Sequence, residues 1–164
     1  MIDNNIFCES FGFNQWIDID TMTDWAQVQM YIFWHSDATV MTRAKPTILV
    51  TDAEGLARCF HDGNEGFDME GFVTCRDYEP ERITQEAKIA YIQHNGTWDP
   101  KHFEDTYEGE YTSPMAFAEQ HVDSMGFFEG AHETLRLYFD WEAYSHDLKN
   151  DYVSINGHYF NRLA

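Results

Sequence analysis

The first half of the chain mixes period-two and helical patterns of apolar residues. Residues 6–9 and 15–19 have the β-branched and aromatic composition of two short strands, joined by a turn at Gly12. Residues 24–34 carry an apolar stripe at helical spacing, which predicts an amphipathic helix. The run TILVT at 47–51 predicts a third strand.

Four further elements are expected before the middle of the chain. Residues 54–60 suit one or two helical turns, and the Gly-rich, acidic run at 61–71 predicts a loop. Residues 72–76 form another candidate strand. A helix is expected from Pro80 to about residue 94, where Asn and Gly follow as stop signals.

The second half reads as a series of helices. Helices are expected over residues 99–109 and 113–125, because each range begins with a capping Asp or Ser followed by proline. Further helical segments are predicted at 129–138 and 140–148, the latter capped by Asp140. This half is therefore expected to be helical until its last residues.

The end of the chain carries the clearest local signal. In YVSINGHYF, residues 152–160, two β-branched and aromatic runs are joined by Asn156 and Gly157, which predicts a hairpin with a type I′ turn. The whole pattern predicts an α+β fold. Three modules are expected: an N-terminal α/β module at 1–80, a helical middle module at 81–112, and a C-terminal α+β module with the hairpin at 113–164.

The net charge restricts the possible functions of the chain more than any motif does. The 164 residues hold 29 Asp and Glu against 10 Lys and Arg, a net charge of −19, and no basic residue precedes Arg43. A hydrophobic content of 43% supports a folded core, so this charge does not indicate disorder. Phosphate binding needs a basic face, so direct nucleic-acid binding is excluded and a basic partner is expected. A halophilic structural protein is the alternative for such a charge.

The acids are concentrated on the predicted helices of residues 103–151. Glu104 with Glu108, and Glu119 with Asp123, are four residues apart, where like charges on a helix repel by a few tenths of a kcal/mol. A chain selected only for stability would alternate the signs of charge there. We interpret the arrangement as a surface that presents negative charge. About 19 negative charges match the charge on roughly 32 Å of duplex DNA.

Catalytic and metal-binding patterns are weak by comparison. Cys8, Cys59 and Cys75 are widely spaced and are interpreted as reduced core residues. The loop at 61–71 fails the EF-hand pattern, and the consecutive residues 145–147 (Ser, His, Asp) cannot form a catalytic relay on a helix. No cofactor and no metal are predicted. A pair of carboxylates converging in a hydrolase site stays open as an alternative.

No targeting or membrane segment is expected. The N-terminus lacks a basic region followed by an apolar run, and the chain has no apolar stretch of 18 residues. We therefore expect a soluble protein inside the cell.

Several segments together resemble one protein family. The segments are FEDTYEGEYTSPMAFAEQHVD at 103–123, YFDWEAYSHDL at 138–148, DYVSINGHYF at 151–160, QWIDID at 15–20 and CRDYEP at 75–80. In order and spacing they resemble the ArdA antirestriction proteins, most specifically in the C-terminal part.

The resemblance implies an elongated, curved rod of small modules that dimerises and imitates bent B-form DNA. Such proteins occupy the DNA-binding cleft of type I restriction-modification enzymes in the bacterial cytoplasm and protect plasmid, transposon or phage DNA. It implies no enzymatic activity. Nine acids would then stand in for phosphates: Glu104, Asp105, Glu108, Glu110, Glu119, Asp123, Asp140, Glu142 and Asp147. An inhibitor of another DNA-binding defence protein, such as a CRISPR effector, is the nearest alternative.

Overall fold

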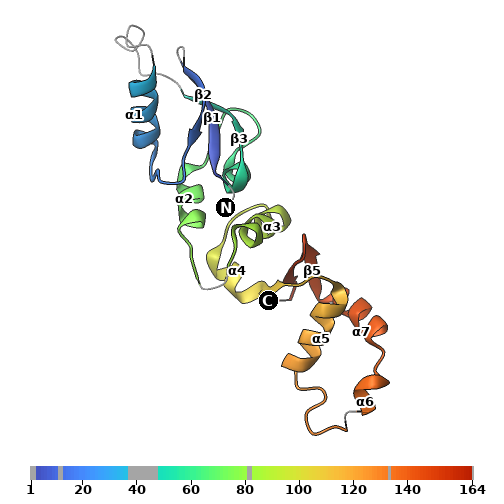
Figure 1. Cartoon of the computed structure of the whole chain (residues 1–164). Helices are drawn as coiled ribbons and strands as arrows, with labels where there is room; N and C mark the ends of the chain where they lie inside the picture. Colours follow the sequence, from blue (N-terminus) through green and yellow to red (C-terminus); the bar gives the residue numbers. More distant parts are fainter. Residues whose placement is uncertain (1–2, 11–12, 37–47, 81–82, 133, 164) are drawn as a thin grey trace. The chain divides into compact units, whose positions relative to one another are not determined.

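The structure is a computed structural model that describes residues 3–10, 13–36, 48–80, 83–132 and 134–163. It divides into two compact units, Met1–Trp98 (unit 1) and Asp99–Ala164 (unit 2), shown in Figure 1. Both units combine helices with a small antiparallel sheet, so the predicted α+β class is confirmed. The division into three modules stays a prediction. No helix in the described ranges is long and apolar enough to cross a membrane.

Unit 1 is built on a three-stranded antiparallel sheet with the order β2-β1-β3. The central strand β1 (Asn5–Ser10) pairs with β2 (Phe13–Asp18) and β3 (Leu49–Ala53), and its side chains alternate between buried and half-buried. The first two predicted strands are therefore confirmed. The third lies two residues later than predicted, and Gly12, the predicted turn residue, lies outside the described residues.

The helix after the sheet's first hairpin forms as predicted. Helix α1 (Trp25–His35) is capped by Asp24, whose carboxylate accepts a hydrogen bond from the Gln27 N–H, and it buries Val28 and Ile32. After β3, a 3₁₀ segment, η1 (Gly55–Phe60), confirms the predicted helical turns.

The prediction of a strand at 72–76 is wrong, and the loop predicted at 61–71 is shorter than expected. Helix α2 (Met69–Arg76) occupies this stretch, because Asp68 caps it by accepting a hydrogen bond from the Gly71 N–H at 2.9 Å. Met69, Phe72 and Cys75 are buried at a spacing of three, which places them on one helix face. The β-branched composition was misleading because burial follows the helical period.

The next helix begins later than Pro80. Helix α3 (Gln85–Asn95) is capped by Thr84 and ends at Gly96, which has a positive φ of 78° as a left-handed terminal residue. The predicted start at Pro80 is therefore wrong, whereas the predicted stop is confirmed. The side chain of Pro80 has no oxygen that could cap a helix. The Thr84 hydroxyl does cap α3, because it accepts a hydrogen bond from the Ala87 N–H at 3.2 Å.

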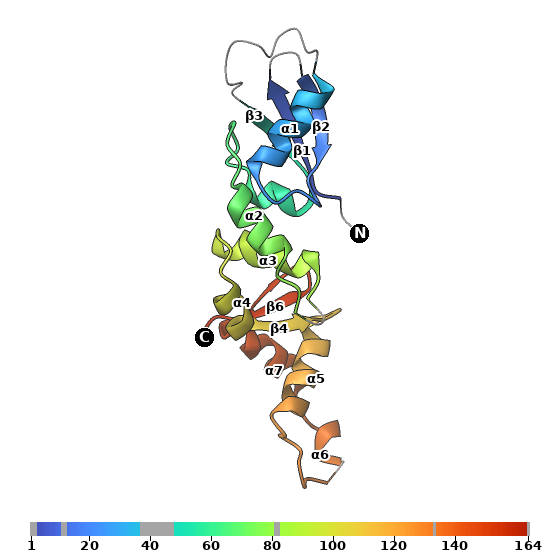
Figure 2. The same cartoon turned by 90° about the vertical axis from the view of Figure 1, so that its left-hand side faces the viewer.

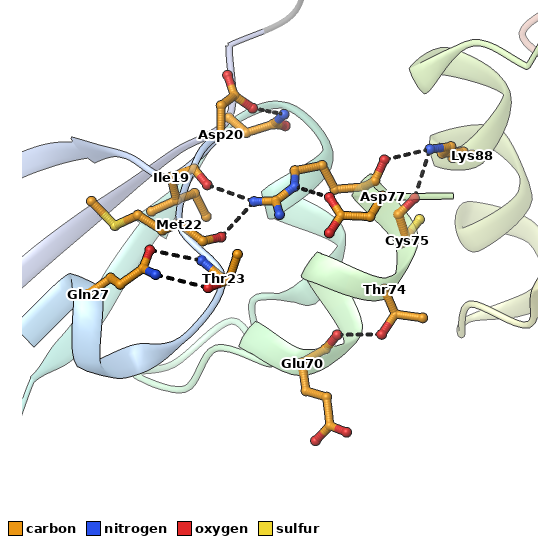
Figure 3. Close-up of polar contacts among 12 residues, drawn as sticks. Ile19, Asp20, Met22, Thr23, Gln27, Glu70, Thr74, Cys75, Asp77 and Lys88 are labelled. Atoms are coloured by element: carbon orange, nitrogen blue, oxygen red, sulfur yellow. Dashed lines mark hydrogen bonds and ion pairs between the residues drawn. The ribbon is translucent and has the colours of Figure 1, made fainter. Parts of the chain in front are cut away.

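Two basic side chains hold these elements of unit 1 together (Figure 3). Arg76 donates hydrogen bonds to the carbonyls of Ile19 and Met22, at 3.2 and 2.6 Å. The buried Lys88 of α3 donates to the carbonyls of Cys75 and Arg76, at 2.7 and 3.1 Å. These are the last carbonyls of α2, which have no partner within the helix. Burial lowers the pKa of Lys88.

Unit 2 places its helices beside a sheet with the order β4-β6-β5 (Figure 2). Asn156 and Gly157, both with positive φ, join β5 to β6, so the predicted hairpin is confirmed. Its elements are α4 (Pro100–Thr106), β4 (Tyr107–Glu110), α5 (Pro114–Ser124), α6 (Thr134–Leu137), α7 (Trp141–Asp147), η2 (Leu148–Asn150), β5 (Tyr152–Ile155) and β6 (His158–Asn161).

Two predicted helices of unit 2 are shorter than expected. Residues 107–110 form strand β4 because β6 offers a pairing edge, with Tyr107 opposite Phe160 and Glu110 opposite His158. In the described part of 129–138, the helix is restricted to α6. The starts of α4, α5 and α7 are as predicted, each with an Asp or Ser cap.

The core of unit 2 is aromatic. Phe117 of α5 stacks on Tyr159 of β6 with ring centroids 4.3 Å apart, and Leu148 packs in the same cluster. Both ring nitrogens of His121 contact tyrosine hydroxyls, those of Tyr144 at 2.8 Å and Tyr152 at 3.1 Å. The core therefore fixes one face of α5 and leaves the opposite face in solvent.

Candidate functional site

Almost all of the carboxylates that the structure describes face solvent. Every Asp and Glu in the described ranges is exposed, apart from Glu9 and Asp20, which are half-exposed. A charge in water avoids the desolvation cost that burial would impose, so the acids need no compensating cation to remain in place. The candidate site is therefore an extended acidic surface rather than a pocket.

Four of the candidate acids lie close together in sequence at the junction of α4 and β4. Glu104 and Asp105 lie on the outer face of α4, because Phe103 and Thr106 point into the core. Asp99 fixes the start of this helix through hydrogen bonds from the N–H groups of Lys101 and His102, at 3.0 and 3.1 Å.

The acids of β4 follow the strand alternation. Glu108 and Glu110 are exposed, whereas Tyr107 and Gly109 between them are half-buried. The register of β4 on β6 shifts between Tyr107 and Gly109, so Glu108 lies at a β-bulge. The predicted helical pairing of Glu104 with Glu108 is therefore wrong, yet both acids of β4 face solvent.

Helix α5 presents the predicted pair of acids. Glu119 and Asp123 are exposed and four residues apart on one helix. Asp123 forms a two-pronged ion pair with Arg136, with N–O distances of 2.9 and 3.3 Å. Asp123 raises the pKa of Arg136 through this hydrogen bond. Part of the charge at Asp123 is therefore compensated on the protein itself.

The three acids of the last helical stretch have different local roles. Asp140 caps α7 by accepting a hydrogen bond from the Ala143 N–H at 2.9 Å, as predicted. Glu142 is exposed in the first turn, and Asp147 is the exposed last residue of the helix. All nine candidate acids thus lie in unit 2 with exposed side chains, and whether they replace phosphates stays a prediction.

Reasoning from sequence left out the acids of unit 1. Glu70, Asp77, Glu79 and Glu86 are exposed, as the nine candidates are, and Asp77 also pairs with Arg76. The motifs used to choose candidates came mainly from the second half of the chain, whereas the absence of basic residues before Arg43 was the signal for the first half. The acidic surface is therefore larger than the candidate set.

The structure offers little support for a catalytic relay. Ser145, His146 and Asp147 are consecutive residues of α7, so their side chains point in different directions. Within the described ranges, no group of three or more His, Cys, Asp and Glu side chains is placed to hold a metal ion. All three cysteines are free thiols, and burial raises the pKa of Cys8 and Cys75 to about 12.

Fold and surface together define a class: a small α+β protein that presents acids to solvent over both of its units. The family model described as antirestriction protein (ArdA) matches residues 9–161. The chain belongs to the ArdA antirestriction protein family. The match includes the N-terminal half, where the sequence motifs are fewest. Searches of curated proteins and of solved structures found no match.

Proposed function

We propose that this antirestriction protein is a DNA mimic that occupies the DNA-binding cleft of a type I restriction-modification enzyme. The supporting observation is the solvent exposure of the acids on a chain of net charge −19. A cleft that binds duplex DNA must be lined with Lys and Arg, so a polyanionic surface competes for the same side chains.

The physical mechanism of this competition is counterion release. DNA and an acidic protein both hold a population of mobile cations, and the enzyme's cleft holds anions that are released on binding. The affinity should consequently fall steeply as salt rises. No single carboxylate should dominate, because each exposed acid contributes one of many similar charge interactions.

The nine candidate acids of unit 2 are the proposed phosphate substitutes. We expect their contributions to differ, because Asp123 already pairs with Arg136 and Asp140 already caps α7. Glu108 and Glu110 of β4 are better placed, since both are exposed and neither takes part in these two contacts. The exposed acids of unit 1 would extend the same surface.

The remaining parts of the proposal follow the family resemblance. The protein would act as a homodimer with an elongated, curved shape, in the cytoplasm of a bacterial host cell. It would require no cofactor and carry out no reaction. Protection of plasmid, transposon or phage DNA would result from blocking cleavage before the host enzyme reaches its site.

The nearest competing function is inhibition of another DNA-binding defence protein, such as a CRISPR effector, by the same charge. Inhibition assays with a type I restriction enzyme and with a CRISPR effector distinguish these two functions. A carboxylate-dependent or metal-dependent hydrolase would instead show turnover and sensitivity to chelator, and a halophilic structural protein would unfold at low salt.

The direct test is a competition assay with a purified type I restriction enzyme and unmodified target DNA. We expect cleavage to stop at near-stoichiometric amounts of the protein and to return when excess DNA is added. Undisturbed cleavage at a large excess of the protein would contradict the proposed target, and a parallel assay with a CRISPR effector would then test the alternative.

A further inference from the structure

Unit 1 contains a surface pocket of about 430 Å³ beside the acidic loop between η1 and α2. Three aromatic residues, Phe60, Phe67 and Trp98, line it together with two acids, Asp62 and Asp68. Its volume lies within the range of ordinary ligand pockets, roughly 300–1,000 Å³. The nine proposed phosphate substitutes all lie in unit 2, and the function proposed above uses the acids of unit 1 only as surface charge, so it gives no role to the pocket itself.

The backbone places the two acids of the pocket on one side of the loop. His61 and Phe67 pair as an antiparallel bridge, and the Asp68 N–H donates to the Phe60 carbonyl at 2.8 Å. Side chains alternate along paired strands, so Asp62 and Asp68 share a face with Phe60, opposite to the face of His61 and Phe67. They are diagonal neighbours across the bridge, a relation that separates residues by about 7–8 Å.

Local hydrogen bonds hold both carboxylates in fixed positions. Oδ1 of Asp62 accepts from the N–H groups of Asn64 and Gly66, at 2.8 and 3.0 Å, and these bonds lower the pKa of Asp62. Oδ1 of Asp68 accepts from the Gly71 N–H as the cap of α2. A Cβ atom at Gly66 or Gly71 would collide with Oδ2 of the neighbouring aspartate. Glycine at both positions therefore leaves room for the carboxylates.

We propose that this pocket, the guanidinium pocket, binds an arginine side chain of the partner protein. A guanidinium group is planar, carries five donors and forms charge-assisted hydrogen bonds to carboxylates. It also stacks on aromatic faces, which the pocket supplies along with its two acids. A neutral side chain would lack both the ion pair with the carboxylates and the cation–π attraction of the rings.

The inference rests on the proposed function for the source of the arginine, because a DNA-binding cleft is rich in arginine. It differs from phosphate mimicry in its chemistry. Exposed surface acids act by many weak contacts, whereas a pocket that holds one side chain between rings and carboxylates acts as a hot spot. The guanidinium pocket would thus give unit 1 a specific contact in addition to its charge.

The test uses a peptide, acetyl-Gly-Arg-Gly-amide, titrated into the full-length protein and followed by ¹H–¹⁵N NMR. We expect saturable shifts at the backbone amides of Gly66, Gly96 and Thr97, which belong to the pocket lining. The same peptide with citrulline in place of arginine keeps the shape and loses the charge. It should produce no saturable shifts at these amides.

A double variant, Asp62→Asn with Asp68→Asn, tests the two carboxylates. Asn keeps the Oδ1 acceptor, so the loop turn and the α2 cap are retained and folding is preserved. We expect the affinity for the arginine peptide to fall about tenfold. The matched control is Asp24→Asn with Asp52→Asn, which removes the same charge from exposed positions of unit 1, one of them also a helix cap. It should bind the peptide like the wild type.

Equal binding of the arginine and citrulline peptides, no binding of either, or equal affinity of the two double variants would overturn the pocket assignment. None of these results depends on a restriction enzyme, so they test the pocket independently of the proposed function. Arginine binding by a protein that leaves restriction untouched would keep the pocket and remove the type I enzyme as its partner.

Discussion

The two units differ in what their basic side chains contact. In unit 1, Arg76 and Lys88 donate to backbone carbonyls and tie α2 to the segment after β2 and to α3, and Arg76 also pairs with the exposed Asp77 at 2.7 Å. In unit 2, Arg136 lies on the surface and pairs with Asp123. Positive charge therefore joins secondary-structure elements in the first unit, whereas Arg136 of the second unit contacts a surface acid. With 29 Asp and Glu against 10 Lys and Arg, the chain keeps a net charge of −19 whichever acids are paired.

Lys88→Met is expected to have the largest effect on stability. The substitution leaves the carbonyls of Cys75 and Arg76 without the donor that ends α2, at a cost of about 2 kcal/mol in the free energy of unfolding. Urea unfolding measures the loss. Lys101→Met, at an exposed lysine, is the control and should change little. Equal stability of both variants would show that the buried lysine has no structural role.

A smaller effect is expected from Asp140→Ala. Removal of the α7 cap should cost about 1 kcal/mol, and Asp140→Asn should restore most of it, since Asn also accepts the bond from the Ala143 N–H. Hydrogen exchange of α7 amides is the sensitive readout, because α7 buries none of its own residues. A phosphate-mimicking role without a capping role would instead make the two variants equally stable.

Arg136→Gln should have the smallest effect on stability, because the ion pair lies at the surface with both side chains about half exposed, at 45% and 50%. Its effect on inhibition is more informative. The substitution leaves Asp123 uncompensated, so inhibition at low salt should be equal to or slightly stronger than that of the wild type. Lys149→Gln makes the same change of charge at another exposed position of unit 2. A marked loss of inhibition with Arg136→Gln alone would place Arg136 itself in the contact with the partner.

Local signals in the sequence were sufficient for much of this fold. Helix caps such as Asp99, Ser113 and Asp140, and the Asn156–Gly157 turn, act within a few residues and were predicted correctly. Strand β4 was missed because its partner β6 lies about 50 residues further along the chain. A strand that forms by pairing with such a distant segment need not show a strand pattern in its own residues.

The sequence predicted that the candidate site is an acidic surface, but it did not predict how the acids are arranged on that surface. Net charge indicated an acidic surface, and the structure exposes every candidate acid. The spacing of Glu104 and Glu108 suggested a helical pair, whereas a helix and a strand hold them separately. The buried Lys88 could not be identified either, because its partners are backbone carbonyls, which every sequence contains.

The most direct test of the account is the salt dependence of binding between this protein and a type I restriction enzyme. The dissociation constant would be measured from 50 to 300 mM salt, with a DNA duplex as reference. We predict a linear fall of log affinity with log salt, with a slope of several units for both the protein and the duplex. Affinity that stays constant over this range would contradict the proposal that the acidic surface replaces DNA.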